Sequence, residues 1–148
     1  MNHKILLATL ISACLCVSAS SPAAAQAKAY KQTKFTRNAD TCFMRTLNFL
    51  EKQAYFIEAV DKASGYIKAK TYAKNSKVFS TKVGERTTIS FLFRQAGNET
   101  LLSLNMYAET LRWGGSTQNK VISLEDKGII DQPSVYRELI DQLAVEMH

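Results

Sequence analysis

Two neighbouring segments of the chain, residues 86–93 and 100–111, alternate with a period of two between apolar and polar side chains. Successive side chains of a strand point to opposite faces of a sheet, so the pattern predicts two strands with one apolar face each. Gly97 and Asn98 lie between the segments and are typical of a turn, which predicts an antiparallel hairpin. Other elements must cover its apolar face. The residues on that face are Thr87, Ile89, Phe91 and Phe93 in the first strand and Leu102, Leu104, Met106 and Ala108 in the second.

Two further segments have the spacing of a helix with one apolar side. The first covers residues 39–53 and can be capped by Asn38 or Asp40, whose side chains accept hydrogen bonds from backbone N–H groups. The second follows Pro133, which loses no hydrogen bond in the first turn of a helix. We expect both helices to pack on the sheet through their apolar stripes. The stripes are Phe43, Met44, Leu47, Leu50 and Ala54 in the first helix and Val135, Tyr136, Leu139, Ile140, Leu143 and Met147 in the second.

A shorter hairpin is predicted between the first helix and the long hairpin. Residues 54–60 are rich in aromatic and β-branched side chains, Gly65 suits a turn, and residues 66–70 alternate again. Residues 71–84 are lysine-rich and weakly patterned, with a short strand expected near residues 78–79. This stretch is the least determined part of the sequence.

Less regular structure is predicted between the long hairpin and the last helix. Residues 113–119 contain Gly114-Gly115 and indicate a flexible loop, and residues 121–124 indicate a short strand or an extended segment. The order of elements is then α-β-β-(β)-β-β-α. It predicts an α+β fold, an antiparallel sheet of about four to five strands with an N-terminal and a C-terminal helix packed on one face.

The first 27 residues have the three parts of a secretory signal peptide. Lys4 gives the positive start, residues 5–17 are uncharged and mostly apolar, and small residues lead to cleavage sites after Ala25 or Ala27. We therefore expect a bacterial protein that is periplasmic or secreted. The rest of the chain contains no run of roughly 20 apolar residues, so no transmembrane segment is expected after cleavage.

Residues 11–14 (ISAC) offer an alternative, because they resemble a lipobox in which Cys14 is acylated and becomes the new N-terminus. The apolar run continues past Cys14, where a lipoprotein normally turns polar, so a lipid-anchored envelope protein is the second interpretation. Cleavage after the alanines leaves Cys42 as the single cysteine, expected to be a small buried side chain. The remaining chain divides into a basic, flexible lead-in, residues 28–38, and a single α+β domain, residues 39–148.

The order of elements resembles a class of small exported bacterial α+β proteins and lipoproteins, in which helices lie across an antiparallel sheet. The resemblance covers about residues 40–148 and is carried by residues 55–61 (YFIEAVD), 65–70 (GYIKAK) and 133–136 (PSVY). The plan is similar to the helix-grip domains of outer-membrane assembly lipoproteins, which implies a binding or scaffolding role. No functional residue carries over from this resemblance.

Residues for catalysis are scarce. His148, the last residue, is the only histidine left after cleavage, although histidine is the commonest general acid or base and the commonest transition-metal ligand. The carboxylate pairs Glu125-Asp126 and Glu138 with Asp141 are poorly placed, since extended neighbours point to opposite faces and the helical pair lies off the apolar stripe. No Ser-x-x-Lys spacing, phosphate loop or calcium loop occurs. The sequence favours a non-enzymatic protein without a cofactor or metal.

Positive charge is concentrated early in the chain. Residues 28–82 contain twelve basic and four acidic residues, whereas residues 83–148 contain six and nine. A lysine-rich surface attracts polyanions. Outside the cytoplasm these are envelope polyanions such as lipid headgroups and lipopolysaccharide phosphates, or acidic protein surfaces, so nucleic acid is not expected as a partner. The candidate ligand-binding residues, which combine charge with aromatic rings, are Tyr66, Lys68, Lys70, Tyr72, Lys74, Lys77 and Trp113.

These observations predict an exported, non-enzymatic binding or accessory domain of the bacterial cell envelope. Its lysine-rich segment, residues 62–82, is expected to meet an anionic partner, and on a strand Tyr66, Lys68 and Lys70 would share one face. The plain alternative for this segment is a solvated sheet edge on which lysines oppose aggregation. Alternative functions are a small envelope enzyme without histidine-based catalysis and a structural subunit of an envelope assembly. The sequence does not indicate an oligomeric state.

Overall fold

A computed structural model describes residues 29–77, 80–116 and 118–147. The expected signal peptide, Cys14, the expected strand near residues 78–79, and His148 lie outside the described residues. The element order is β1 (Gln32–Phe35), α2 (Ala39–Lys52), β2 (Phe56–Asp61), β3 (Tyr66–Lys74), β4 (Lys82–Ala96), β5 (Glu99–Ser116), β6 (Asn119–Ile129) and α3 (Pro133–Met147).

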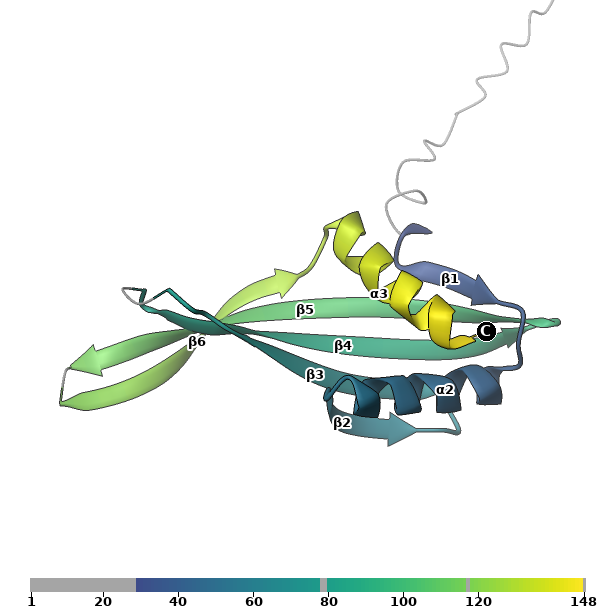
Figure 1. The fold of residues 1–148 in the computed structure, drawn as a ribbon, viewed down its shortest axis with the longest axis horizontal. Helices are drawn as coiled ribbons and strands as arrows, with labels where there is room; N and C mark the ends of the chain where they lie inside the picture. The colour runs from purple at the N-terminus through teal and green to yellow at the C-terminus, as the bar shows by residue number, and fades with distance from the viewer. Residues whose placement is uncertain (1–28, 78–79, 117, 148) are drawn as a thin grey trace, which may run out of the picture.

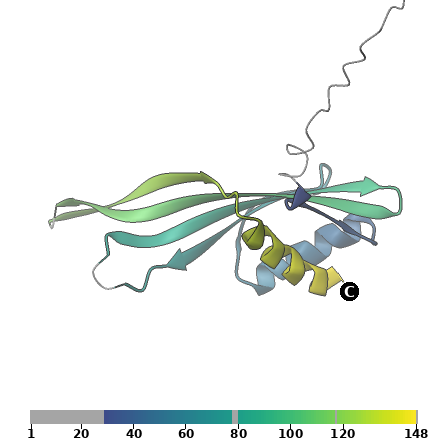
Figure 2. The ribbon, with the colours of Figure 1, turned by 90° about the horizontal axis from the view of Figure 1, so that it is seen from above.

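The described strands form one antiparallel sheet, and α2 and α3 lie on the same side of it (Figures 1 and 2). The order across the sheet is β1-β5-β4-β3-β2, and β6 pairs with the part of β5 that extends beyond β1. This confirms the α+β class and the antiparallel sheet. The sheet has six strands, however, and is larger than the four to five expected.

Helix α2 begins where the sequence indicated, because the Asn38 side chain accepts a hydrogen bond from the Thr41 N–H at 2.7 Å. Its buried side differs from the predicted stripe. Met44 is 46% exposed, whereas Thr46 and Phe49 are buried. The buried arc runs through Cys42, Phe43, Thr46, Phe49 and Leu50, and Met44, about 100° further round the helix from Phe43, falls outside it. Phe43 takes the inner position and meets Phe93 of β4 edge to face, with ring centroids 5.9 Å apart.

The hydrophobic core lies between the sheet and the two helices. The long hairpin contributes the face that the alternation predicted, and Ile89, Phe91 and Phe93 are buried opposite Met106, Leu104 and Leu102. Helix α3 contributes most of its predicted stripe, with Tyr136, Leu139, Leu143 and Met147 buried. Among the described residues, no helix combines the length and the apolar character needed to cross a membrane.

Three strands differ from the expected elements. Residues 32–35 of the expected flexible lead-in form β1, which pairs with Thr100–Ser103 at the edge of the sheet. Residues 113–116 of the expected loop are instead the end of β5, and Asn119 begins β6, because the pairing of the two strands extends to Ser116 and Asn119. The short strand expected at residues 121–124 is part of the much longer β6. Pairing with β5 stabilises these segments, although their own sequences show little alternation.

Candidate functional site

The sheet face turned away from α2 and α3 is called here the open face (Figure 2). On β3 the core residues are Ile67 and Ala69, so the residues between them point the other way. Five of the predicted ligand-binding residues therefore share the open face: Tyr66, Lys68, Lys70, Tyr72 and Lys74. Trp113 also lies on this face, because the buried residues of β5 are the even-numbered ones, up to Thr110. Lys77 lies beyond the end of β3.

Lys68 and Lys70 share one carboxylate, that of Glu58 in β2. Lys68 Nζ lies 2.9 Å from Glu58 Oε2, and Lys70 Nζ contacts Glu58 Oε1. Glu58 is the extra residue of a β-bulge, since the register with β3 shifts between Ile57 and Ala59. Hydrogen bonds from Lys70 and then Lys68 lower the pKa of Glu58. Each of the two lysines is thus held in an ion pair, although together they exceed the charge of Glu58 by one. They are less available to an anionic partner than the sequence indicated.

A second ion pair lies beside them, between β4 and β5. Arg86 and Glu109 stand opposite each other in the register, and the guanidinium donates two hydrogen bonds to the carboxylate, at 2.8 and 2.9 Å. Such two-point pairs hold both side chains in one geometry. The pairing lowers the pKa of Glu109, chiefly through the hydrogen bonds from Arg86. Sequence reasoning missed this pair, because only the register of the long hairpin places Arg86 opposite Glu109.

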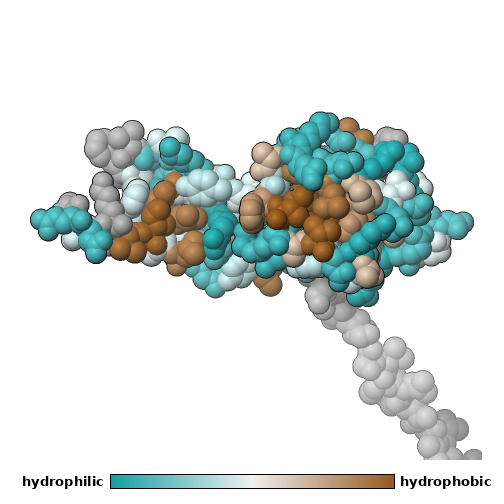
Figure 3. All heavy atoms as spheres, turned by 90° about the horizontal axis from the view of Figure 1, so that it is seen from below, coloured by the Kyte–Doolittle hydropathy of each residue, from teal (hydrophilic) through white to brown (hydrophobic). Residues whose placement is uncertain are grey.

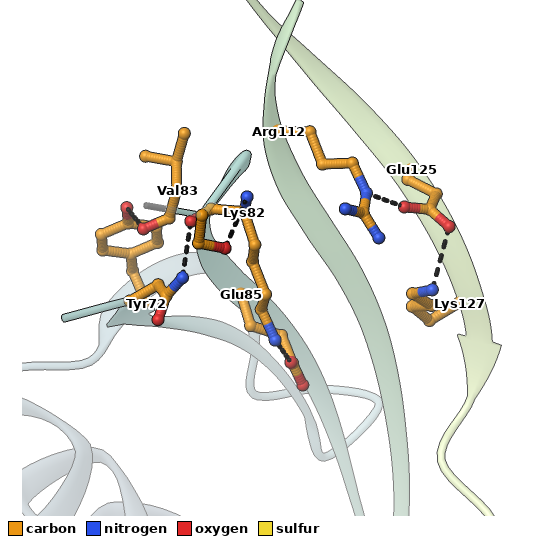
Figure 4. Close-up of polar contacts among 9 residues, drawn as sticks. Tyr72, Lys82, Val83, Glu85, Arg112, Glu125 and Lys127 are labelled. Carbon is orange, nitrogen blue, oxygen red and sulfur yellow. Dashed lines mark hydrogen bonds and ion pairs between the residues drawn. The ribbon is translucent and has the colours of Figure 1, made fainter. Parts of the chain in front are cut away.

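Tyr72 lies across Gly84 at the edge of the open face. A Cβ atom on Gly84 would be 2.5 Å from Tyr72 Oη, so the ring occupies the space that a side chain would need. The Tyr72 hydroxyl donates to the Val83 carbonyl oxygen at 3.4 Å (Figure 4). An open groove of about 630 Å³ borders Tyr72, and its lining includes Phe56, Lys70 and Arg86.

Lys74 and Lys77 differ from the other lysines of the segment. Both are exposed, and neither forms an ion pair within the described part of the chain. By contrast, Lys62 lies 3.7 Å from Asp40 and Lys82 lies 2.8 Å from Glu85. Lys74 and Lys77 are therefore the lysines of the segment without an ion pair to the described residues, and Lys74 follows Tyr72 by two residues on the same strand.

The outer part of the β5–β6 hairpin has one apolar and one charged side. The register places Leu111 opposite Leu124 and Trp113 opposite Ile122, so all four side chains belong to the open face. On the other side Glu125 pairs with Arg112 and with Lys127 (Figure 4). Figure 3 shows apolar side chains at this end of the molecule and again along the β2 edge. Of these four residues only Trp113 is among the ligand-binding residues predicted from the sequence, because Gly114-Gly115 predicts a loop over residues 113–119.

The described residues contain few groups suited to catalysis. They include no cluster of three or more His, Cys, Asp or Glu side chains that could hold a metal ion. Cys42 is buried as expected, and burial raises the pKa of its thiol, which keeps it protonated at neutral pH. Lowered carboxyl pKa values on the open face and on the hairpin result from hydrogen bonds with lysine and arginine side chains. These are features of a structural ion-pair network.

No protein-family model and no curated protein matches this chain. The fold and the site therefore define its class: an α+β domain in which helices cover one face of an antiparallel sheet. The other face presents ion pairs and exposed aromatic rings, and on it Lys74 forms no ion pair with the described residues.

Proposed function

We propose that the protein is an exported, non-enzymatic binding or accessory domain of the bacterial cell envelope, which contacts an anionic partner through the end of β3. The observation that carries this proposal is the position of Lys74 and Lys77. Both are exposed without an ion pair in the described part of the chain, and Lys74 shares the open face with the half-exposed ring of Tyr72. Charge and a stacking surface are thus available together.

The backbone at this place supports the proposal. The Asn75 N–H donates to Val83, and the Gly65 carbonyl accepts from Phe93, so odd-numbered residues of β3 bond to β4. The peptide groups of even-numbered residues then point to the β2 side. Because β2 begins opposite Lys70, the N–H groups of Tyr72 and Lys74 lie beyond its end and can donate to an anionic group. Lysine charge and backbone donors therefore point into the same region.

Binding to anionic vesicles tests the proposal. Vesicles containing phosphatidylglycerol should retain the protein at low ionic strength and release it at high ionic strength, because salt screens exposed charges. Vesicles of phosphatidylcholine alone should retain little of the protein. A soluble acidic peptide is added as competitor, and its effect distinguishes binding to a protein surface from binding to a lipid headgroup. Retention that does not change with salt would contradict the proposal.

Charge reversal locates the contact. The double variant Lys74→Glu/Lys77→Glu should lose most of the salt-dependent retention. The matched control is Arg94→Glu/Arg137→Glu, which makes the same change of charge at two exposed residues without ion pairs in the described region. Equal losses in the two variants would mean that only net charge matters. Lys68 and Lys70 are left unchanged, because their substitution would also leave Glu58 without its partners.

The proposed export has its own test. The intact mass of the protein purified from the producing bacterium should correspond to a chain that begins at Gln26 or Lys28. A chain that begins at an acylated Cys14 would establish the lipid-anchored alternative. The mass of the uncleaved chain would contradict export through a signal peptide.

A further inference from the structure

We propose that two copies of this chain associate along β6, edge to edge and antiparallel, so that their two sheets become one. This contact lies at the same end of the sheet as Lys74 but on the opposite edge, since the register joins Lys74 through Gly84 and Leu111 to Leu124. It does not depend on the proposed function. Strand β6 is an edge strand: among the described strands it pairs only with β5, and its second side meets none. Figure 1 shows the β5–β6 hairpin extending away from both helices, which leaves room for a second copy.

The backbone of β6 has free hydrogen-bonding groups on its outer side. The Trp113 N–H donates to the Thr81 carbonyl oxygen at 2.8 Å and is thus directed away from β6. Trp113 and its opposite residue Ile122 therefore form a pair that is not hydrogen-bonded, and the peptide groups of Ile122 point outward. Because the pattern repeats every two residues, the peptide groups of Leu124 also point outward. A row of such groups is a template for another strand.

The side chains of this edge favour association on one face. Ile122 is 48% exposed and Leu124 is 50% exposed, and both lie on the open face beside Leu111 and Trp113. A single edge strand leaves this apolar surface in water. Pairing with a second β6 would bring two such surfaces together and bury part of each.

Two antiparallel copies of β6 have complementary side chains in one register. Outward peptide groups meet only when even-numbered residues face even-numbered residues. With Ser123 on the twofold axis, Ile122 of each copy lies opposite Leu124 of the other. This register therefore places apolar side chains opposite each other on the open face.

The neighbouring registers are less favourable. An axis through Leu124 would place Ile122 opposite Asp126, and an axis through Ile122 would place Asp126 opposite residue 118, outside β6. The regular part of β6 also ends after Asp126, where the register with β5 shifts. Ser123 is the midpoint of residues 120–126, so an axis through this residue pairs all of the regular strand except Asn119.

A disulfide between two copies tests the contact and its register. Ser123→Cys places two thiols opposite each other at a pair that is not hydrogen-bonded, where Cα atoms lie about 4.5 Å apart. This separation is within the range of about 4.4–6.8 Å that a disulfide spans. The matched control is Val121→Cys, on the same side of β6, where the two cysteines would be roughly 13 Å apart along the strands. Mild oxidation of the purified protein should link the Ser123→Cys variant into a dimer and leave the control no more linked than the wild type.

Sedimentation measurements test the association without cysteine. The purified protein should form a dimer whose dissociation constant rises about tenfold or more in Ile122→Lys/Leu124→Lys. The control Val121→Lys has a new charge on the opposite side of the strand, facing Glu125 of the second copy, and should keep the dimer. Far-ultraviolet circular dichroism of the variants establishes that the fold is intact.

Three results would overturn the inference. The wild type could remain a monomer at high micromolar concentration, or the Ile122→Lys/Leu124→Lys variant could dimerise as well as the wild type. Equal cross-linking of the Val121→Cys and Ser123→Cys variants would rule out the proposed register. A wild-type monomer that binds vesicles through Ile122 and Leu124 would identify the apolar side of the hairpin as a lipid contact instead.

Discussion

The backbone N–H of Met106 donates a hydrogen bond to the phenol oxygen of Tyr136, 3.1 Å away in the core. The same hydroxyl donates to the carbonyl oxygen of Ile130 at 2.9 Å, and the Ile130 N–H donates to the Met106 carbonyl at 2.9 Å. Tyr136 is fully buried. The Tyr136 side chain thereby satisfies the N–H of Met106 in β5 and the carbonyl of Ile130, which follows β6. These bonds hold the start of α3 against the sheet.

Removal of this hydroxyl should destabilise the protein. Tyr136→Phe leaves the Met106 N–H without its partner, and a buried unsatisfied group costs about 1–3 kcal/mol. Urea unfolding followed by circular dichroism should show a free energy of unfolding lower by about that amount. Tyr55→Phe is the matched control, because the Tyr55 hydroxyl makes no hydrogen bond to the described residues. An equal loss in both variants would contradict the role given to Tyr136.

At Thr46, removal of a hydroxyl should instead stabilise the protein. The Thr46 Oγ1 atom is buried in α2 and has no hydrogen-bond partner in the described structure. Thr46→Val keeps the shape of the side chain and removes the unsatisfied oxygen, so the free energy of unfolding should rise by about 1 kcal/mol. Thr100→Val is the control, since Thr100 is equally buried but donates to the Arg37 carbonyl at 2.7 Å. That variant should lose stability, and a loss in Thr46→Val as well would show that Thr46 is satisfied in solution.

The parts of the fold that the sequence predicted are those where periodicity and burial coincide. Leu102, Leu104 and Met106 alternate over a full strand because one side of β5 packs against helices, and the spacing from Tyr136 to Met147 follows from the same contact. Strand β1 shows no such pattern, because its four residues form an edge of the sheet and are held mainly by backbone pairing with β5. Gly114-Gly115 indicated a loop, although a hairpin strand tolerates glycine when its partner supplies the hydrogen bonds.

The face on which the candidate site lies was predicted from local alternation, whereas the ion pairs on it were not. Alternation alone places Tyr66, Lys68 and Lys70 on one face, and the structure has them there. Their partner Glu58 depends on a β-bulge, which no local pattern reveals. The Arg86–Glu109 pair depends on the register of two strands, which is set by the whole hairpin. Sequence therefore identified the charged face but not which of its charges remain unpaired.

The contact between Tyr72 and Gly84 gives a third prediction. Gly84→Ala places a methyl group on the outer atoms of the Tyr72 ring, which is half-exposed and can move aside. The cost should therefore be about 1 kcal/mol of unfolding free energy, the low end for an added methyl group. In the double variant Gly84→Ala/Tyr72→Ala the clash is gone, so the added cost of the alanine should largely disappear.

Gly114→Ala is the control for this prediction. An added Cβ there has its nearest neighbours at 3.7 Å, in ordinary van der Waals contact, so the variant should unfold close to the wild type. If Gly84→Ala costs the same with and without Tyr72, the ring is not what excludes a side chain at residue 84.

The hairpin carries a carboxylate with an unusual pKa. Hydrogen bonds from Arg112 and then Lys127 lower the pKa of Glu125 from 4.5 to about 2, although its side chain is partly exposed. A pKa lowered by folding means that the ionised group stabilises the hairpin above about pH 4.5. This contribution is lost as the pH falls from about 4.5 towards about 2. Nuclear magnetic resonance titration of the Glu125 carboxyl carbon should report the low value directly.

Substitution of one partner shows whether the arginine holds this carboxylate. In Arg112→Gln the pKa of Glu125 should rise towards 4.5, because only the hydrogen bond from Lys127, at 2.9 Å, remains. In Lys127→Gln it should rise less, since the contribution of Arg112 is the larger of the two. The Glu125→Gln variant should lose less stability than the wild type between pH 4.5 and pH 2, because it has no carboxylate to protonate. A wild-type Glu125 that titrates near 4.5 would mean that the ion pair does not persist in solution, and the charged side of the hairpin would then contribute nothing to its rigidity.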